Sequence, residues 1–151
     1  MEIQIKDIKK LREQTECSIS DCKNALIDSK GDFDKAIKFL VKKGAEMLEK
    51  KKDRATNSGV VEAYSHNGRI GVIVEILCET DFVARNEIFK NFVHDIAMQI
   101  AAMNPKNVEE LMKQVYIKDE TKTIKELFDY TITKIGENIQ INRFERFELG
   151  N

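Results

Sequence analysis

The dipeptide Asn67-Gly68 constrains the fold most, because it lies between two stretches rich in β-branched and apolar residues, 60–65 and 69–78. Both central residues of a type I′ turn need a positive φ angle, which Asn and Gly adopt more readily than other residues. The pattern therefore predicts an antiparallel hairpin that begins near Gly59 and ends near Cys78.

A helix is predicted next, at residues 87–102, where apolar side chains recur at helical spacing in two adjacent columns. We expect this broad apolar face to pack on the hairpin. His94 lies off the columns, and we interpret it as a solvated side chain rather than a ligand or a base. The columns consist of Ile88, Phe89, Phe92, Val93, Ile96, Ala97, Ile100 and Ala101.

The remaining chain predicts two more helices and a final strand. Pro105 breaks the preceding helix, and a short helical segment is expected at residues 108–115. Thr123 and Glu126 have the spacing of a capping box and open a helix that runs to about Ile135.

The last strand, residues 139–149, alternates between apolar and polar residues, but Phe144 breaks the alternation. A bulge near Arg143 would restore the register. We expect this apolar strand to be an edge of the sheet, where unpaired amides tend to acquire a partner strand.

The first part of the chain predicts three short helices. Ser18 and Asp21 have capping-box spacing, Asp32 occupies an N-cap position, and Gly44 is expected to end the third helix. The prediction is an α+β protein: a three-helix domain at residues 1–44, a frayed helix and linker at 45–58, and an α+β core at 59–151, in which an antiparallel sheet packs against helices.

Composition limits the function. The formal net charge of −1 argues against a nucleic-acid binder that neutralises phosphates. The lysine run at residues 50–52 is interpreted as a solvated face, with weak support for an acidic partner surface. No apolar stretch is long enough to span a membrane.

Three cysteines without a CxxC pair and two distant histidines offer no zinc spacing, so we expect no metal site. Cys22 and Cys78 lie within apolar patterns and are interpreted as core residues. A reducing cytosol fits this usage. Met1 leads directly into charged residues, and no targeting segment is visible. We therefore expect a cytoplasmic protein.

Signatures of catalysis are absent from the sequence. There is no Gly-x-Ser-x-Gly elbow, no phosphate-binding glycine loop and no His-Glu-x-x-His motif. The glycines are scattered at predicted caps and turns. We therefore expect neither an enzyme nor a cofactor.

The joint between the hairpin and the next helix, residues 80–86, places Asp81 beside Phe82. In one interpretation, Thr80 or Asp81 caps the helix and Phe82 packs into the core. In the other, the pair projects outward, and the aromatic ring is an anchor that enters a pocket on another protein. The pattern alone favours the first.

Four stretches resemble the elongation factor Ts family, in the family's order. They are Leu11-Arg12-Glu13 with Thr15 and residues 21–26, then residues 31–37, then Thr80-Asp81-Phe82-Val83-Ala84, and finally Lys134-Ile135-Gly136-Glu137-Asn138-Ile139. The resemblance implies that the first three helices form a ubiquitin-associated-like domain, and that the protein is a nucleotide exchange factor for elongation factor Tu.

The resemblance also implies a mechanism. Asp81 and Phe82 would enter the G domain of elongation factor Tu, where the ring wedges between two helices and disturbs the region that holds Mg²⁺ on the nucleotide phosphates. A factor that prefers the nucleotide-free partner must lower its affinity for GDP by the same coupling factor.

Further contacts follow from the resemblance. Ile135 and Gly136 match a pair that approaches the phosphate-binding side of the partner, although Gly136 is equally explained as a helix C-cap. Arg12, Ile19 and Lys23 match contacts to the G domain, although Arg12 and Lys23 are also ordinary surface charges. Ser20 stands where the family suggests a methionine, which predicts a smaller apolar contact.

The chain resembles the short form of the family, in which two copies pair, so we expect a homodimer through the C-terminal strand. Another hypothesis is a binding module, an adaptor or nascent-chain factor with a ubiquitin-associated-like domain, which leaves Asp81-Phe82 without a role. An RNA-binding domain is disfavoured by the charge balance.

Overall fold

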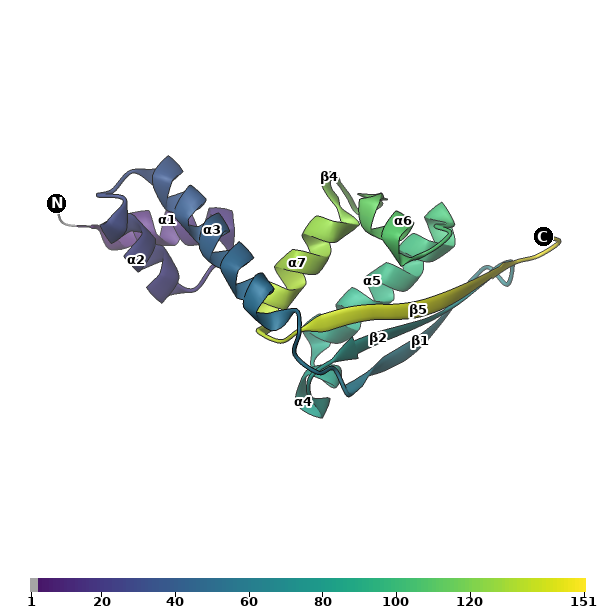
Figure 1. Cartoon of the computed structure of the whole chain (residues 1–151). Helices are drawn as coiled ribbons and strands as arrows, with labels where there is room; N and C mark the ends of the chain where they lie inside the picture. The colour runs from purple at the N-terminus through teal and green to yellow at the C-terminus, as the bar shows by residue number, and fades with distance from the viewer. Residues whose placement is uncertain (1–2) are drawn as a thin grey trace. The chain divides into compact units, whose positions relative to one another are not determined.

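The computed structural model describes residues 3–151, which form seven helices and five strands (Figure 1). The chain divides into two compact units, Met1–Lys50 and Lys51–Asn151. The predicted domain start at Met1, and the inference drawn from Met1 about targeting, lie outside the described residues. Helices and strands together give the α+β class predicted from the sequence.

The first unit is built from α1 (Ile5–Thr15), α2 (Ile19–Asp28) and most of α3 (Phe33–Lys51). The predicted caps are confirmed: the backbone N–H of Asp21 donates to the Ser18 hydroxyl at 3.0 Å, and that of Lys35 donates to the Asp32 carboxylate at 3.1 Å. The small core consists of Leu11, Cys22, Ala25, Leu26, Ala36 and Leu40.

The predicted helix end at Gly44 is wrong, because α3 continues through this residue to Lys51. A glycine ends a helix by adopting a positive φ angle, and Gly44 does not adopt one. The residues that follow it are mostly Ala, Glu, Met, Leu and Lys, which favour helix enough to offset the roughly 1 kcal/mol that a glycine costs. Residues 52–57 then contain neither helix nor strand.

The second unit contains the predicted hairpin, β1 (Ser58–His66) and β2 (Ile70–Cys78), with φ angles of 54° at Asn67 and 67° at Gly68. The last strand, β5 (Ile139–Glu148), pairs antiparallel with β2, so the sheet order is β1-β2-β5. This arrangement confirms the predicted edge strand.

The predicted bulge in β5 is also confirmed. Glu75 lies opposite Arg143, whereas the next residue of β2, Ile76, lies opposite Ile141. Asn142 is therefore the extra residue. Its side-chain amide donates to the Glu75 carboxylate and holds the bulge against β2.

One face of the sheet is covered by α5 (Glu87–Met103), as expected (Figure 1). Seven residues of the predicted apolar face are buried, but Ile88 remains 40% exposed in the first turn of the helix. His94 is exposed as predicted; its Nδ1 atom lies 3.0 Å from the Glu62 carboxylate, and its ring packs edge-on against Tyr64.

A second small hairpin was not predicted. It consists of β3 (Val115–Tyr116) and β4 (Asp119–Thr123) and follows α6 (Val108–Lys113), which ends two residues before the predicted position. The fully buried Gln99 of α5 holds this hairpin: its amide donates to the Val115 carbonyl at 3.0 Å and accepts from the backbone of Ile117 at 2.9 Å.

The last helix, α7 (Ile124–Ile135), begins at the predicted cap, where the backbone N–H of Glu126 donates to the Thr123 hydroxyl at 3.2 Å. It ends at Gly136, whose φ angle is 85°. The chain then turns into β5, so the end of α7 and the start of β5 are joined by only three residues.

Candidate functional site

The joint after β2 forms a separate helical turn, α4 (Asp81–Ala84), before α5 begins. The Thr80 hydroxyl accepts from the backbone N–H of Val83 at 3.4 Å and caps this turn. Asn86 caps α5 through a 2.8 Å hydrogen bond from the N–H of Ile88. The predicted cap at Thr80 therefore exists, but it opens α4 rather than the long helix.

Phe82 projects from this turn and is 83% exposed, so the interpretation that packs its ring into the core is wrong. Asp81 beside it is also exposed, whereas Ala84 on the opposite side of the turn is buried. The Arg85 guanidinium lies 6.0 Å from the centre of the Phe82 ring, at the outer limit of a cation–π contact. The turn thus presents a carboxylate and a bare aromatic ring together.

The base of the turn is held by Glu137, which follows α7. One carboxylate oxygen accepts from the backbone N–H groups of Glu79 and Thr80, both at 3.1 Å. The other oxygen accepts from the Thr80 hydroxyl at 2.8 Å. Hydrogen bonds to a carboxylate are stronger than those between neutral groups, so this contact anchors the start of the turn firmly.

Glu79 makes the reciprocal contact. Its carboxylate accepts from the backbone N–H of Asn138 at 2.7 Å and lies 3.8 Å from the Arg54 guanidinium. The buried Asn138 side chain donates to the Arg54 carbonyl at 2.8 Å. The strand end, the α7 end and the segment before β1 are therefore tied together by polar contacts.

Ile135 and Gly136 lie at this same junction and are both half-buried. The Lys51 ammonium donates to the Gly136 carbonyl at 2.7 Å and occupies the space about 3.8 Å from where a Cβ would be. The interpretation of Gly136 as a helix C-cap is confirmed by its positive φ angle and by its N–H, which donates to the Ile132 carbonyl. The junction brings this pair to the base of the Asp81-Phe82 turn.

Arg12, Ile19 and Lys23 belong to the first unit, and all three are exposed. Ile19 and Lys23 lie one turn apart on α2 and so share a face of that helix. Arg12 lies in the last turn of α1. The apolar side chain of Ile19 is 58% exposed, and several other apolar side chains of this unit are exposed as well, among them Ile5 and Val41.

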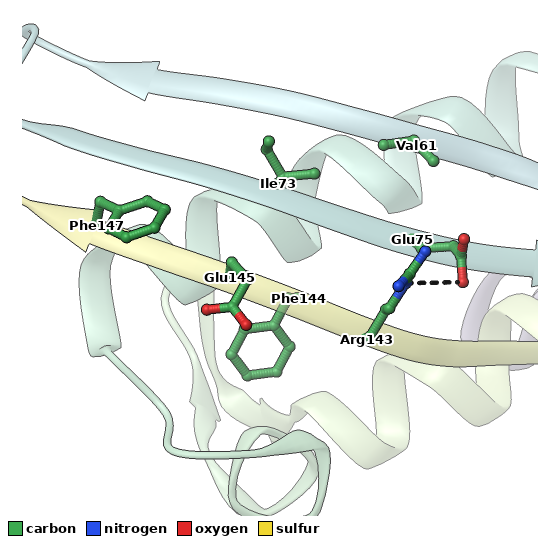
Figure 2. A pocket seen from close by; sticks show the side chains of 7 residues that line it. All are labelled: Val61, Ile73, Glu75, Arg143, Phe144, Glu145 and Phe147. Carbon is green, nitrogen blue, oxygen red and sulfur yellow. Dashed lines mark ion pairs between the residues drawn. The ribbon is translucent and has the colours of Figure 1, made fainter.

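A second exposed surface lies on the face of the sheet opposite α5. Figure 2 shows Val61, Ile73 and Phe147 on three neighbouring strands, and these side chains are 62%, 55% and 72% exposed. They line a groove of about 330 Å³, beside an ion pair of 3.5 Å between Glu75 and Arg143. We call Val61, Ile73 and Phe147 the open sheet face.

The thiols of Cys22 and Cys78 are fully buried, as predicted. Burial raises the pKa of both thiols, so they stay protonated and unreactive at neutral pH. Within residues 3–151, no three His, Cys, Asp or Glu side chains are grouped to hold a metal ion. None of the helices in the same range combines the length and the apolar character needed to cross a bilayer.

Sequence reasoning missed the roles of Glu79 and Glu137. Glu137 is part of a stretch that carries the family resemblance, which was the only available signal. A carboxylate that binds backbone N–H groups 57 and 58 residues away leaves no periodic trace in the sequence. The open sheet face was not anticipated: the sequence indicated only an apolar edge strand at residues 139–149, and Val61 and Ile73 were not singled out.

Comparison with known proteins gives a consistent result. A family model described as Elongation factor TS matches residues 79–151. A protein named Elongation factor Ts from Caldanaerobacter subterraneus subsp. tengcongensis is 42% identical over 189 residues, which cover 95% of this chain and 94% of the relative. The protein of that name from Thermotoga neapolitana is 40% identical and covers 99% of this chain and 98% of the relative.

A third relative of the same name, from Rippkaea orientalis, is 41% identical over 99% of this chain and 79% of its own length. Each of these alignments is longer than the 151 residues of this chain. The relatives therefore contain internal residues that have no counterpart here.

Proposed function

Because this chain belongs to the elongation factor Ts family, the nucleotide exchange factors of elongation factor Tu, we propose that it releases GDP by inserting the Asp81-Phe82 turn into its partner. It is an exchange factor and not an enzyme. The proposal concerns which residues act and how.

The observation that supports this role most directly is the exposure of Phe82 on a turn that is fastened at its base. An aromatic ring that is 83% exposed has little contact with its own protein, so its apolar surface is available to a partner. A buried aromatic anchor supplies about 2–4 kcal/mol, or roughly 30- to 1000-fold in affinity.

This binding energy accelerates GDP release from the partner if it is gained only when the partner has lost its nucleotide. The Phe82 ring wedges between two helices of the G domain, and Asp81 enters with it. The shift disturbs the region that holds Mg²⁺ on the phosphates, which weakens GDP binding. By linkage, the factor lowers GDP affinity as much as GDP lowers affinity for the factor.

The other family positions serve as supporting contacts. Ile135 and Gly136 approach the phosphate-binding side of the partner, near the base of the turn. Arg12, Ile19 and Lys23 contact the G domain from the first unit, and their exposure leaves them free for this role. The first unit is proposed to contain the ubiquitin-associated-like domain, predicted at residues 1–44, which ends before the unit boundary at Lys50.

The test is the release of fluorescent GDP from elongation factor Tu, followed by stopped flow, with wild type and with Phe82→Ala. Wild type should accelerate release, and Phe82→Ala should lose about a hundredfold of the effect at equal concentration. Unchanged release with wild type would remove the exchange function and favour the adaptor hypothesis. A folded, fully active Phe82→Ala variant would remove only the site assignment.

We further propose that two copies pair through the C-terminal strand, in the cytoplasm. The support is the open sheet face, whose three large apolar side chains lie at diagonal positions on β1, β2 and β5, with Glu75 and Glu145 between them. Large apolar side chains that share one exposed face and are rimmed by charged residues are typical of a protein contact surface. A twofold contact would cover this face with the same face of the second copy.

Sedimentation equilibrium of the full chain at micromolar concentration tests the pairing. A mass of twice 17.4 kDa is expected. A single species with the mass of one chain across this concentration range would contradict the homodimer, and it would leave the role of Phe82 untouched.

A further inference from the structure

We propose that Glu137 is a positioning residue for nucleotide exchange, because its carboxylate fixes the direction in which the Asp81-Phe82 turn projects. This inference rests on the proposed function of that turn. Glu137 is not proposed to contact elongation factor Tu. Glu79 makes the matching contact from the other side of the junction within this chain.

The first two backbone N–H groups at the start of the turn bind the same carboxylate, that of Glu137. The strand pairing of β2 on both sides ends at Cys78, so the N–H groups of Glu79 and Thr80 lie beyond the ladder. Both donate to Glu137. Buried or half-buried N–H groups that lose their acceptor are costly, so these two amides depend on one carboxylate for their position.

The turn itself is too short to hold its own orientation. α4 has four residues, and Ala84 is its one buried side chain. Val83 is half-buried beside β1 and β2, and these two small apolar side chains do not by themselves fix the rotation of so short a turn about its point of attachment. The charged hydrogen bonds at Thr80 therefore carry most of the constraint on where Phe82 points.

The contact runs in both directions. Glu137 accepts from the backbone of Glu79 and Thr80, while Glu79 accepts from the backbone of Asn138 at 2.7 Å. In each of these two segments, which lie almost sixty residues apart, a glutamate carboxylate accepts a hydrogen bond from the backbone of the other segment. The Asp81-Phe82 turn and the Ile135-Gly136 pair move as one body rather than as two loops.

Such a rigid connection matters because the ring must push on its partner. If the turn were mobile, part of the binding energy of the ring would be offset by the entropy lost when the turn becomes ordered. If the turn is already held in place, that part remains available to displace the helices of the partner. Loosening the turn should therefore lower the maximal rate of GDP release, even where the protein still binds.

The first measurement is amide hydrogen exchange by NMR on the free full-length chain. In Glu137→Ala, the amides of Glu79 and Thr80 should lose roughly tenfold or more of their protection, while the central amides of β2 keep theirs. Glu137→Gln should keep protection within about threefold of wild type, since its carbonyl oxygen still accepts both N–H groups. Glu120→Ala, at an exposed carboxylate on β4, is the matched control and should change nothing.

The second measurement is GDP release from elongation factor Tu at saturating concentrations of each variant. Glu137→Ala should lower the maximal rate about tenfold, and Glu137→Gln should restore most of it. In a Phe82→Ala background, Glu137→Ala should add less than a twofold change, because a positioning residue has nothing left to position. If Glu137→Ala does not fold, Glu137→Asp keeps the charge, shortens the reach and should give an intermediate loss in both measurements.

The outcomes separate the two levels of the argument. A wild-type rate equal to the spontaneous rate overturns the proposed function, while the hydrogen-exchange result still decides whether Glu137 fixes the turn. Accelerated release by wild type, with an equally active Glu137→Ala, overturns the positioning role alone. A tenfold loss that persists undiminished in the Phe82→Ala background also overturns it, because the effect would then not act through the ring.

Discussion

Phe82 and Phe147 are similarly exposed, at 83% and 72%, but their surroundings differ. Phe82 stands on a four-residue turn between Asp81 and Arg85, with polar contacts fastening its base. Phe147 lies on the face of a sheet, with Ile73 on the neighbouring strand and Glu145 on its own strand (Figure 2). The comparison shows that the neighbours of an exposed ring, rather than its exposure, indicate what it binds.

An isolated ring that projects from a turn fits a pocket narrow enough to surround it, and most of the binding energy then comes from that one residue. A ring within a flat apolar face fits another flat face, and its energy is shared with its neighbours. We therefore propose that the turn binds elongation factor Tu and that the open sheet face binds a second copy of the chain. Substitutions in one place should leave the other function intact.

The largest effect is expected from Phe147→Glu. In a twofold interface the substitution occurs twice, and each lost ring costs about 2 kcal/mol, so the dimer should weaken roughly a thousandfold. Sedimentation equilibrium measures the shift from dimer to monomer. Phe82→Glu is the matched control and should leave the dimer unchanged; a dimer that tolerates Phe147→Glu would place the interface elsewhere.

The second prediction concerns the charge beside the wedge. Asp81→Asn keeps the shape of the side chain, and it should lower the rate of GDP release about tenfold if the carboxylate is paired in the complex. The loss should shrink at high salt, because screening weakens the wild-type contact. Glu87→Gln, at the same position in the first turn of α5, is the control and should stay within about twofold of wild type.

The parts of the fold that were predicted correctly depend on short-range chemistry. Asn67-Gly68 needs only its own φ angles, and the caps at Ser18, Asp32 and Thr123 bind N–H groups three residues away. The bulge near Arg143 followed from a break in alternation. Each of these signals lies within a few residues of the structure that it specifies.

The predictions that were wrong or missing depend on contacts between residues far apart in the sequence, or on the combined effect of several residues. Gly44 was expected to end a helix, but the helix-forming residues after it outweigh a single glycine. The β3-β4 hairpin consists largely of polar residues, and Gln99 from a distant helix supports it. The local pattern favoured a Phe82 ring packed in the core, because the contact with Glu137 that holds the turn crosses almost sixty residues of sequence. Local patterns do not report such contacts.

The third prediction tests whether the ring also depends on its own turn. Arg85→Ala removes the guanidinium that lies 6.0 Å from the Phe82 ring, and the contact is worth about 0.5–1 kcal/mol at an exposed site. GDP release should slow about two- to fivefold, with Arg85→Lys retaining part of the rate. Equal rates for wild type and Arg85→Ala would mean that the clamp at Glu137 is sufficient to orient the ring.

The smallest effect is expected at Glu75, a carboxylate beside the open sheet face. The hydrogen bond from Asn142 lowers its pKa below the usual value, with a further contribution from Arg143. A carboxyl group whose pKa is lowered by folding stabilises the folded state above its unfolded pKa, and this stabilisation is lost as the pH falls through the folded pKa.

Urea unfolding of wild type and Glu75→Gln, compared between about pH 6 and about pH 3, measures this contribution. Wild type should be slightly more stable than Glu75→Gln at the higher pH, and the difference should vanish at the lower pH, where Glu75 is protonated. A difference in unfolding free energy that does not change with pH would mean that the charge of Glu75 contributes nothing and that its side chain holds the bulge by shape alone. The charged hydrogen bonds that Glu137 makes below Phe82 would then have no counterpart beside the open sheet face.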